Sequence, residues 1–212
     1  MFGIRNLTLS RTEHDGFGQA VHGFYRDSFA ALYKIDSSSV SGECGYLTRH
    51  ADFIVPLLKA ASRGFGDKIN FFYDIRNSEE YEQPSPDYAL LSRADLNHVS
   101  PLCIRDKEGA SLITALQIAR FDAVGDDEPV LFCCSEMFTR YDKDFDGSLK
   151  ACAFLLFPNA EGAEYTLEVT DNSCVQRSGL TEPFFALSEG MTKEVCAEYS
   201  LGGIMLRKRD EQ

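Results

Sequence analysis

Short apolar runs typical of buried strands alternate with amphipathic helical segments through the middle of this chain, and no other feature constrains its fold as strongly. The helical pattern is clearest at 109–124, where Leu112, Ala115, Leu116 and Ala119 fall on one stripe. The predicted helices are 17–33, 51–63, 86–94 and 109–124, and the predicted strands are 68–75, 99–104, 130–138, 148–158 and 163–174. Towards the end of the chain, a helix is predicted over 181–200 and a final strand over 202–209.

This alternation favours a largely parallel sheet covered by helices, with antiparallel strands where strand segments follow each other directly. We therefore predict an α/β fold whose mixed, mostly parallel sheet has five strands and is flanked by helices. Pro56 is expected in the first turn of its helix, where a missing N–H costs least, and Gly64 and Gly66 are expected to end that helix. The length of 212 residues suits a single domain over 1–212, with 175–212 as a C-terminal appendage.

The chain is strongly acidic, with a net charge of −12 and a pI of about 4.8. Such a surface repels the phosphates of nucleic acids and the headgroups of anionic lipids, so neither a nucleic acid nor a membrane is expected as a partner. No apolar run approaches the roughly 20 residues of a membrane-spanning helix. The first residues, MFGIRNLTLSRTEHDG, lack the apolar core of a signal peptide, and we expect a cytoplasmic protein.

Seven cysteines are scattered along the chain, and none forms a C-x-x-C pair. Several lie in apolar segments, which favours buried, reduced thiols over a disulfide framework or a zinc site. The adjacent Cys133 and Cys134 could form a vicinal redox pair. In a buried strand, however, one thiol points to each face, and both act as small apolar side chains.

The stretch YDKDFDGSL places Asp142, Asp144 and Asp146 before a glycine, as in the first half of an EF-hand calcium loop. Counted from Asp142, position 12 is Ala153 rather than the glutamate that binds calcium through both oxygens. The flanking segments have strand patterns, whereas an EF-hand loop connects two helices. We therefore reject these three aspartates as an EF-hand and predict a solvated turn between two strands. A weak cation site of another kind stays open, and calcium titration of the thermal stability tests it.

Other polar residues are weaker candidates for a site, and no cofactor is predicted. His98 and Cys103 are close in sequence and could form a Cys–His dyad, but LNHVSP is typical of a turn that enters a strand. Asp74 and Glu136 lie at the ends of predicted strands, where open sheets bind ligands, and ordinary solvation at a loop edge explains them equally well. The acidic residues of 78–83 are predicted to form a solvated loop.

Four consecutive segments also carry a resemblance to a known family. They are the helix at 51–63 with the strand KINFFYDI, the helix and strand of PSPDYALLSRADLNHVSPLCI, the helix GASLITALQIARF, and the strand–loop–strand EPVLFCCSEMFTRYDKDFDGSLKACAFLLFP. In this order and at these separations, residues 51–158 resemble the N-terminal half of a thiolase-fold condensing enzyme of the ketoacyl synthase family. The resemblance implies that the chain is a thiolase-like half.

The chain departs from this family where the family has its catalytic residues. The family's nucleophilic cysteine precedes the central helix, and that position falls at Glu108 or Gly109, neither of which can attack a thioester. A carboxylate there stabilises the N-terminus of a helix instead. The family's catalytic histidine and its partner come from a second half, for which residues 159–212 are too few. No catalytic residue is therefore predicted.

Two functions follow from the resemblance. The first is a non-catalytic, ketosynthase-like accessory protein of an acyl-chain or natural-product biosynthetic pathway. It would form a homodimer, or a heterodimer with a condensing-enzyme-like subunit, or would contact an acyl carrier protein. The second is an acyl-transfer or condensing enzyme that uses an unrecognised cysteine nucleophile or a site shared with a partner.

Overall fold

A computed structural model of the chain describes residues 1–13, 46–76, 87–105, 110–123, 128–136, 148–170, 179–199 and 201–209. Its strands are β1 (Phe2–Glu13), β2 (Phe71–Arg76), β3 (Ser100–Arg105), β4 (Val130–Glu136), β5 (Ser148–Phe157), β6 (Tyr165–Thr170), β7 (Glu194–Tyr199) and β8 (Gly202–Lys208). Its helices are α2 (Tyr46–Ala61), the short 3-10 helix η2 (Gly66–Lys68), α3 (Asp87–Arg93), α4 (Ala110–Asp122) and α5 (Glu182–Ser188). The order from α2 to β6 is the predicted one, and the helix predicted at 17–33 lies outside the described residues.

The strands form one eight-stranded sheet in the order β3-β2-β4-β5-β1-β6-β8-β7. Strand β2 is parallel to β3 and β4, and the other five pairings between described strands are antiparallel. The α/β class is confirmed, whereas the prediction of a five-stranded, mostly parallel sheet is wrong. The sheet is larger and more antiparallel because β1, β7 and β8, from the two ends of the chain, extend it through antiparallel pairing.

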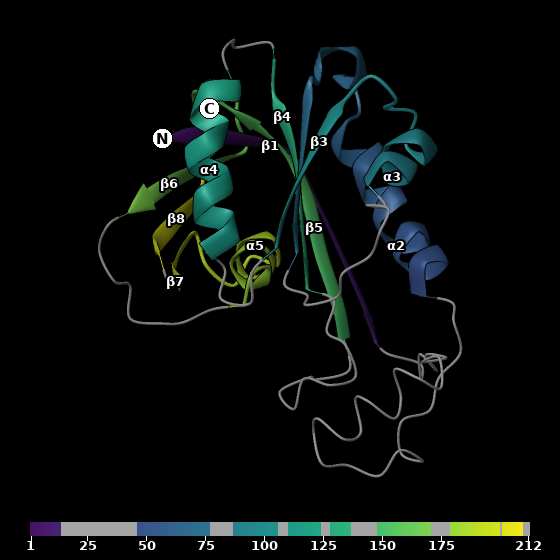
Figure 1. The fold of residues 1–212 in the computed structure, drawn as a ribbon. Helices are drawn as coiled ribbons and strands as arrows, with labels where there is room; N and C mark the ends of the chain where they lie inside the picture. The colour runs from purple at the N-terminus through teal and green to yellow at the C-terminus, as the bar shows by residue number, and fades with distance from the viewer. Residues whose placement is uncertain are drawn as a thin grey trace.

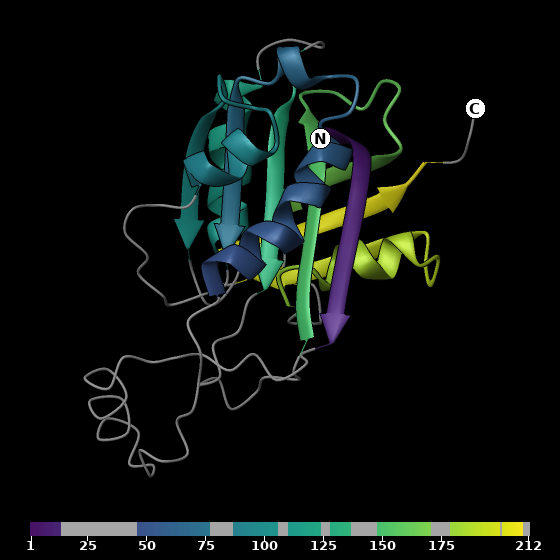
Figure 2. The same cartoon turned by 90° about the vertical axis from the view of Figure 1, so that its right-hand side faces the viewer.

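Helices cover both faces of the sheet. In Figure 1 the central strands are seen nearly edge-on, with α2 and α3 on one side and α4 and α5 on the other. Figure 2 shows α2 lying across the central strands. The sheet therefore has two cores. Phe72 and Leu131 belong to the one under α2 and α3, and Phe132, Phe154 and Phe184 belong to the one under α4 and α5. The last three rings stack, with centroids 5.4 Å and 5.1 Å apart.

Strand β1 contains a bulge at Asn6, which has a positive φ of 54°. Its pairing with β5 shifts register there, so Ile4 and Leu7 both contribute to the core under α4 and α5. The Asn6 amide nitrogen Nδ2 donates hydrogen bonds to the carbonyl oxygens of Ala61 at 2.9 Å and Arg63 at 3.0 Å, where α2 ends. The sequence did not predict this strand, because the bulge interrupts the period of two.

Two predictions about helices are wrong. Helix α2 begins at Tyr46, so Pro56 lies in its interior rather than in its first turn. Among the described residues of 181–200, only Glu182–Ser188 are α-helical, because Gly190, with a φ of 73°, follows the helix and the residues after it alternate as strand β7. The predicted final strand is confirmed as β8. No helix in the described part of the chain is long and apolar enough to cross a membrane.

Candidate functional site

Polar residues gather where the parallel strands β2, β3 and β4 end, at one edge of the sheet. Asp74 and Arg76 lie on β2, Cys103 lies on β3, and Glu136 ends β4. Side chains alternate along a strand, and accordingly Arg76 contacts α3 whereas Glu136 contacts the start of α5. Glu136 is at the end of its strand, as predicted, whereas Asp74 lies two residues before the end of β2. Both are buried, so the interpretation as solvated loop-edge residues is wrong.

On the α3 side, Arg76 lies between two carboxylates. Its Nε donates a hydrogen bond to Asp74 at 2.7 Å, and its Nη2 donates one to Asp87 at 2.7 Å and also contacts Asp74. The three side chains are at most 5% exposed. Burial alone would lower the pKa of Arg76, but the two carboxylates raise it above its ordinary value. The triad fixes the first residue of α3 to the sheet.

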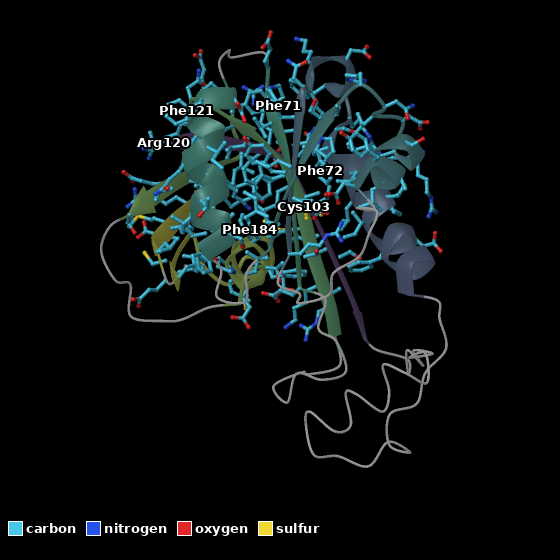
Figure 3. The ribbon with its side chains drawn as sticks, viewed as in Figure 1. Phe71, Phe72, Cys103, Arg120, Phe121 and Phe184 are labelled. Atoms are coloured by element: carbon cyan, nitrogen blue, oxygen red, sulfur yellow. The ribbon has the colours of Figure 1, made fainter. Side chains whose placement is uncertain are left out.

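Cys103 brings a third possible metal ligand to the same place. One ligand atom from each of Asp74, Asp87 and Cys103 lies within 4.8 Å of the others, a grouping that could hold a metal ion. Cys103, labelled in Figure 3, is partly exposed. Arg76, however, already supplies the positive charge that the two carboxylates need. The geometry therefore fits an internal ion-pair triad better than a metal site.

On the α5 side, Glu136 is held by Thr181. The backbone N–H of Thr181 donates to Glu136 Oε1 at 2.9 Å, and its hydroxyl donates to Oε2 at 3.0 Å. Burial raises the pKa of Glu136 above its ordinary value, and the two hydrogen bonds from Thr181 oppose that shift. Lys150 on β5 is the register partner of Glu136 and acts in the same direction as Thr181. Both oxygens of this carboxylate are thus engaged within the fold.

The described cysteines of β4 and β5 are buried thiols, as predicted. Cys133 belongs to the core under α2 and α3, and Cys134 belongs to the opposite core, so the two neighbours do not face each other. Cys134 and Cys152 are register partners on adjacent strands. Burial raises the pKa of all three thiols above its ordinary value. These cysteines therefore lack the lowered pKa of a catalytic nucleophile.

Several predicted site residues fall outside the described part of the chain. These are Glu108 and Gly109 before α4, and the rejected calcium ligands Asp142, Asp144 and Asp146. The segments on either side of the three aspartates are the strands β4 and β5, as predicted, and an EF-hand loop has helices there. The rejection of an EF-hand stays a prediction that these flanking strands favour.

Ser111 carries a hydroxyl group in the first described turn of α4. Its hydroxyl is buried and has no hydrogen-bond partner among the described residues. His98, exposed in the turn before β3, contacts the carbonyl oxygen of Gly66 through Nε2 at 3.1 Å. His98 therefore lies in a turn, as expected. This turn precedes β3, so His98 is far from the carboxyl end of that strand. The described residues thus show no base poised to activate Ser111.

Sequence reasoning missed the residues that complete the interactions of Asp74 and Glu136. Arg76 could have been found, because D-I-R places two opposite charges on the same face of a strand. Asp87 and Thr181 gave no such signal, because they lie 11 and 45 residues from the side chains that they bind.

Comparisons with known proteins add a likeness in structure. No protein-family model matches the chain, and no curated protein matches its sequence. PksG, an HMG-CoA synthase from Bacillus subtilis, is 14% identical over 88% of this chain and 50% of its own, with a TM-score of 0.45. The tetronic acid condensing enzyme AbyA1 is 12% identical over 90% of this chain and 70% of its own, with a TM-score of 0.47. The HMG synthase of the curacin biosynthetic pathway, in complex with its acetyl donor-ACP, is 13% identical over 84% and 47%, with a TM-score of 0.45.

PksG and the curacin protein are HMG synthases, and AbyA1 is a condensing enzyme. The chain spans about half the length of PksG and of the curacin synthase. Because the identities are 12% to 14% and the TM-scores are below 0.5, neither the residue roles nor the activities of these proteins are assigned to this chain.

Proposed function

We propose that the chain is a non-catalytic, ketosynthase-like accessory protein of an acyl-chain or natural-product biosynthetic pathway. The observation that carries this proposal is the burial of Cys133, Cys134 and Cys152, whose exposed fractions are 0%. Because burial raises the pKa of these thiols, they stay protonated at neutral pH and are poor nucleophiles. The sequence supports the same conclusion by placing Glu108 and Gly109 where the resembled family has its cysteine.

The proposed function requires a partner, which is either another subunit or an acyl carrier protein. Helix α4 carries Ile118 and Phe121 three residues apart, and their side chains are 37% and 80% exposed. Figure 3 labels Phe121 and its neighbour Arg120 on this helix. An exposed aromatic ring beside an exposed isoleucine suits a surface that another protein covers. We therefore propose that a second copy of the chain, or a condensing-enzyme-like subunit, packs against α4.

We also propose that residues 1–212 form a single domain and that the protein is cytoplasmic. Strands β7 and β8 support the single domain, because β8 pairs with β6 and β7 pairs with β8 in the one sheet. Within 175–212, β7 and β8 therefore belong to the same sheet as β6.

The oligomeric state tests the proposed partner. Sedimentation velocity at tens of micromolar is expected to show a dimer, or binding of an added acyl carrier protein. Phe121→Glu is expected to abolish that association, because it places a charge in the buried interface. Tyr88→Glu is the matched control, because Tyr88 is a 69% exposed aromatic residue on α3, on the other side of the sheet. A strict monomer that binds no acyl carrier protein would overturn the proposal.

The second candidate function is an acyl-transfer or condensing enzyme, and Cys103 is the observation that favours it. This thiol is partly exposed, and Arg76 is close enough for its charge to favour a thiolate. Asp74 and Asp87 oppose that effect, because each places a carboxylate oxygen within 4.8 Å of the sulfur. Iodoacetamide labelling at neutral pH, followed by peptide mapping, separates the two functions. One cysteine that reacts much faster than glutathione supports the enzyme, and uniformly slow labelling supports the accessory protein.

A further inference from the structure

Cys134 on β4 and Cys152 on β5 form a closely opposed pair of thiols. They are directly opposite in the register of these antiparallel strands, their side chains belong to the same core, and they are hydrogen-bonded to each other. The Cα atoms of opposite residues in an antiparallel pair are about 4.5 or 5.5 Å apart. Disulfides span Cα separations of roughly 4.4–6.8 Å, so the backbone allows a bond between these two sulfurs.

Helix α5 covers this pair through two contacts, one on each side of the pair along the strands. Glu136, the next residue of β4 on the same face, accepts hydrogen bonds from Thr181 at the start of α5. Phe154, the next residue of β5 on that face, stacks on Phe184 of α5 with a centroid distance of 5.1 Å. Because α5 has only seven residues and such a short helix is marginal by itself, these contacts hold it over the pair.

A cavity of about 330 Å³ opens beside the pair, where α5 meets β5. Its lining includes Lys150, two residues before Cys152 on the same face of β5, and three residues of α5, which are Glu182, Pro183 and Ala186. Basic and acidic side chains occur in equal number among its described lining residues, so the cavity favours no net charge. Hydrogen peroxide is neutral and little larger than a water molecule, which occupies ~30 Å³, so it can enter.

We propose that Cys134 and Cys152 are a redox-modification site, at which hydrogen peroxide forms a disulfide between β4 and β5 when α5 opens. While α5 is closed, both thiols are 0% exposed and are poor nucleophiles. Local opening of a short helix costs less free energy than unfolding of the whole chain, so the pair becomes accessible before the rest of the core does. The proposal is independent of the accessory function, because it requires neither a partner nor a catalytic cysteine.

The reaction proceeds in two steps. In the open form, one thiol loses its proton to water and the thiolate attacks peroxide, so that an S–O bond forms, the O–O bond breaks and hydroxide leaves, giving a sulfenic acid. The second sulfur then attacks the sulfur of the sulfenic acid. The S–S bond forms, the S–O bond breaks, and the oxygen leaves as water with the proton of the second thiol. Two electrons pass from the two sulfurs to one peroxide molecule, which becomes two molecules of water.

Peptide mapping tests the modification. The reduced protein is exposed to ~1 mM hydrogen peroxide at neutral pH without denaturant, the remaining thiols are blocked with N-ethylmaleimide in denaturant, and the digest is analysed by mass spectrometry. We expect two peptides joined through Cys134 and Cys152, about 2 Da lighter than the reduced pair, and dithiothreitol should separate them. Cys134→Ala and Cys152→Ala should each abolish the joined peptides. Cys133→Ala, the matched change at the neighbour that faces the opposite core, should retain them. No joined peptides after several hours, or an equal loss in Cys133→Ala, would overturn the proposal.

The rate of disulfide formation tests the role of α5. Thr181→Val removes a hydrogen bond that holds α5 closed, and it is expected to speed the reaction about tenfold, since a hydrogen bond to a charged group shifts an equilibrium by about that factor. Thr166→Val, the same change at a half-buried position on β6, should leave the rate unchanged. An unchanged rate in Thr181→Val, or the same acceleration in Thr166→Val, would overturn the opening of α5.

Urea distinguishes local opening from global unfolding in the unmodified protein. Opening of α5 exposes little surface, so ~1 M urea should raise the rate of disulfide formation less than about twofold. Global unfolding exposes far more surface, and its population should rise more than about fivefold over the same range. A rate that follows the population of unfolded protein would show that the pair reacts only in the unfolded chain, and would overturn the proposal.

Discussion

Thr181 donates hydrogen bonds to both carboxylate oxygens of Glu136, at 2.9 Å and 3.0 Å, although 45 residues separate the two. Both residues are buried. Thr181→Val removes only the hydroxyl donor, and we expect the free energy of unfolding to fall by about 1–3 kcal/mol, because a buried carboxylate oxygen loses its partner. Urea denaturation measures the loss. The control Thr166→Val makes the same change at a half-buried position on β6, and a comparable loss there would contradict the explanation.

The pH dependence of stability should also report on Glu136. Its pKa in the folded protein is raised by burial, so the folded state binds the proton more tightly than the unfolded state does. The stabilising contribution is therefore fully present below the unfolded pKa of about 4.3 and is lost as the pH rises through the folded pKa. Relative to Glu136→Gln, the wild-type protein should lose stability as the pH rises from the unfolded pKa of about 4.3 through the folded pKa. A difference between the two proteins that stays constant from acidic to neutral pH would contradict the prediction.

Arg76→Met should be the most destabilising single change in the α3-side triad. It leaves the buried carboxylates of Asp74 and Asp87 without their cation, and we expect a loss of about 3–5 kcal/mol in the free energy of unfolding. Arg93→Met removes an ion pair with Asp52 in which both side chains are about half exposed, and should cost less than about 1 kcal/mol. Equal losses in chemical denaturation would show that the triad does not stabilise the fold.

Pro56 should limit the stability of α2. A proline in the helix interior donates no hydrogen bond to the carbonyl four residues earlier, and this side chain is exposed, so its replacement sacrifices little packing. Pro56→Ala is expected to raise the free energy of unfolding by about 1–3 kcal/mol. Pro183→Ala should give no gain, because Pro183 is buried in the first turn of α5, where proline is well tolerated. A thermal melt in which Pro56→Ala unfolds at a lower temperature would refute this prediction.

Gly3 is required by a close contact rather than by its backbone angles. A Cβ at this position would lie 2.3 Å from the carbonyl oxygen of Asn159 and 2.8 Å from the Cβ of Ala163. Gly3→Ala should therefore destabilise the protein by about 1–3 kcal/mol or more, because neither neighbour is the flexible end of a side chain. Gly66→Ala is the control, since its nearest neighbour would be 4.0 Å away. Similar midpoints of denaturation for both variants would argue against the contact.

The segments with a clear period were predictable from the sequence, and the contacts that hold them together were not. The stripe of 109–124 marks α4 because its apolar residues repeat along the chain itself. Strand β1 escaped prediction because the bulge at Asn6 moves the apolar residues from even to odd positions. For the candidate site, alternation along a strand accounts for the placement of Asp74 and Arg76 on one face. The engagement of Glu136 by Thr181 arises only when distant segments pack, and no local pattern encodes it.

The position of β1 between β5 and β6 determines when this part of the sheet can form during synthesis. This strand is synthesised before its partners, since Gly3 pairs with Phe157 on β5 and with Thr166 on β6. At roughly 5–20 residues per second, a ribosome needs about 8–30 s to add the ~150 residues between these partners. During synthesis, β1 remains without its native neighbours for that interval, so this part of the sheet cannot form until β5 and β6 have left the ribosome.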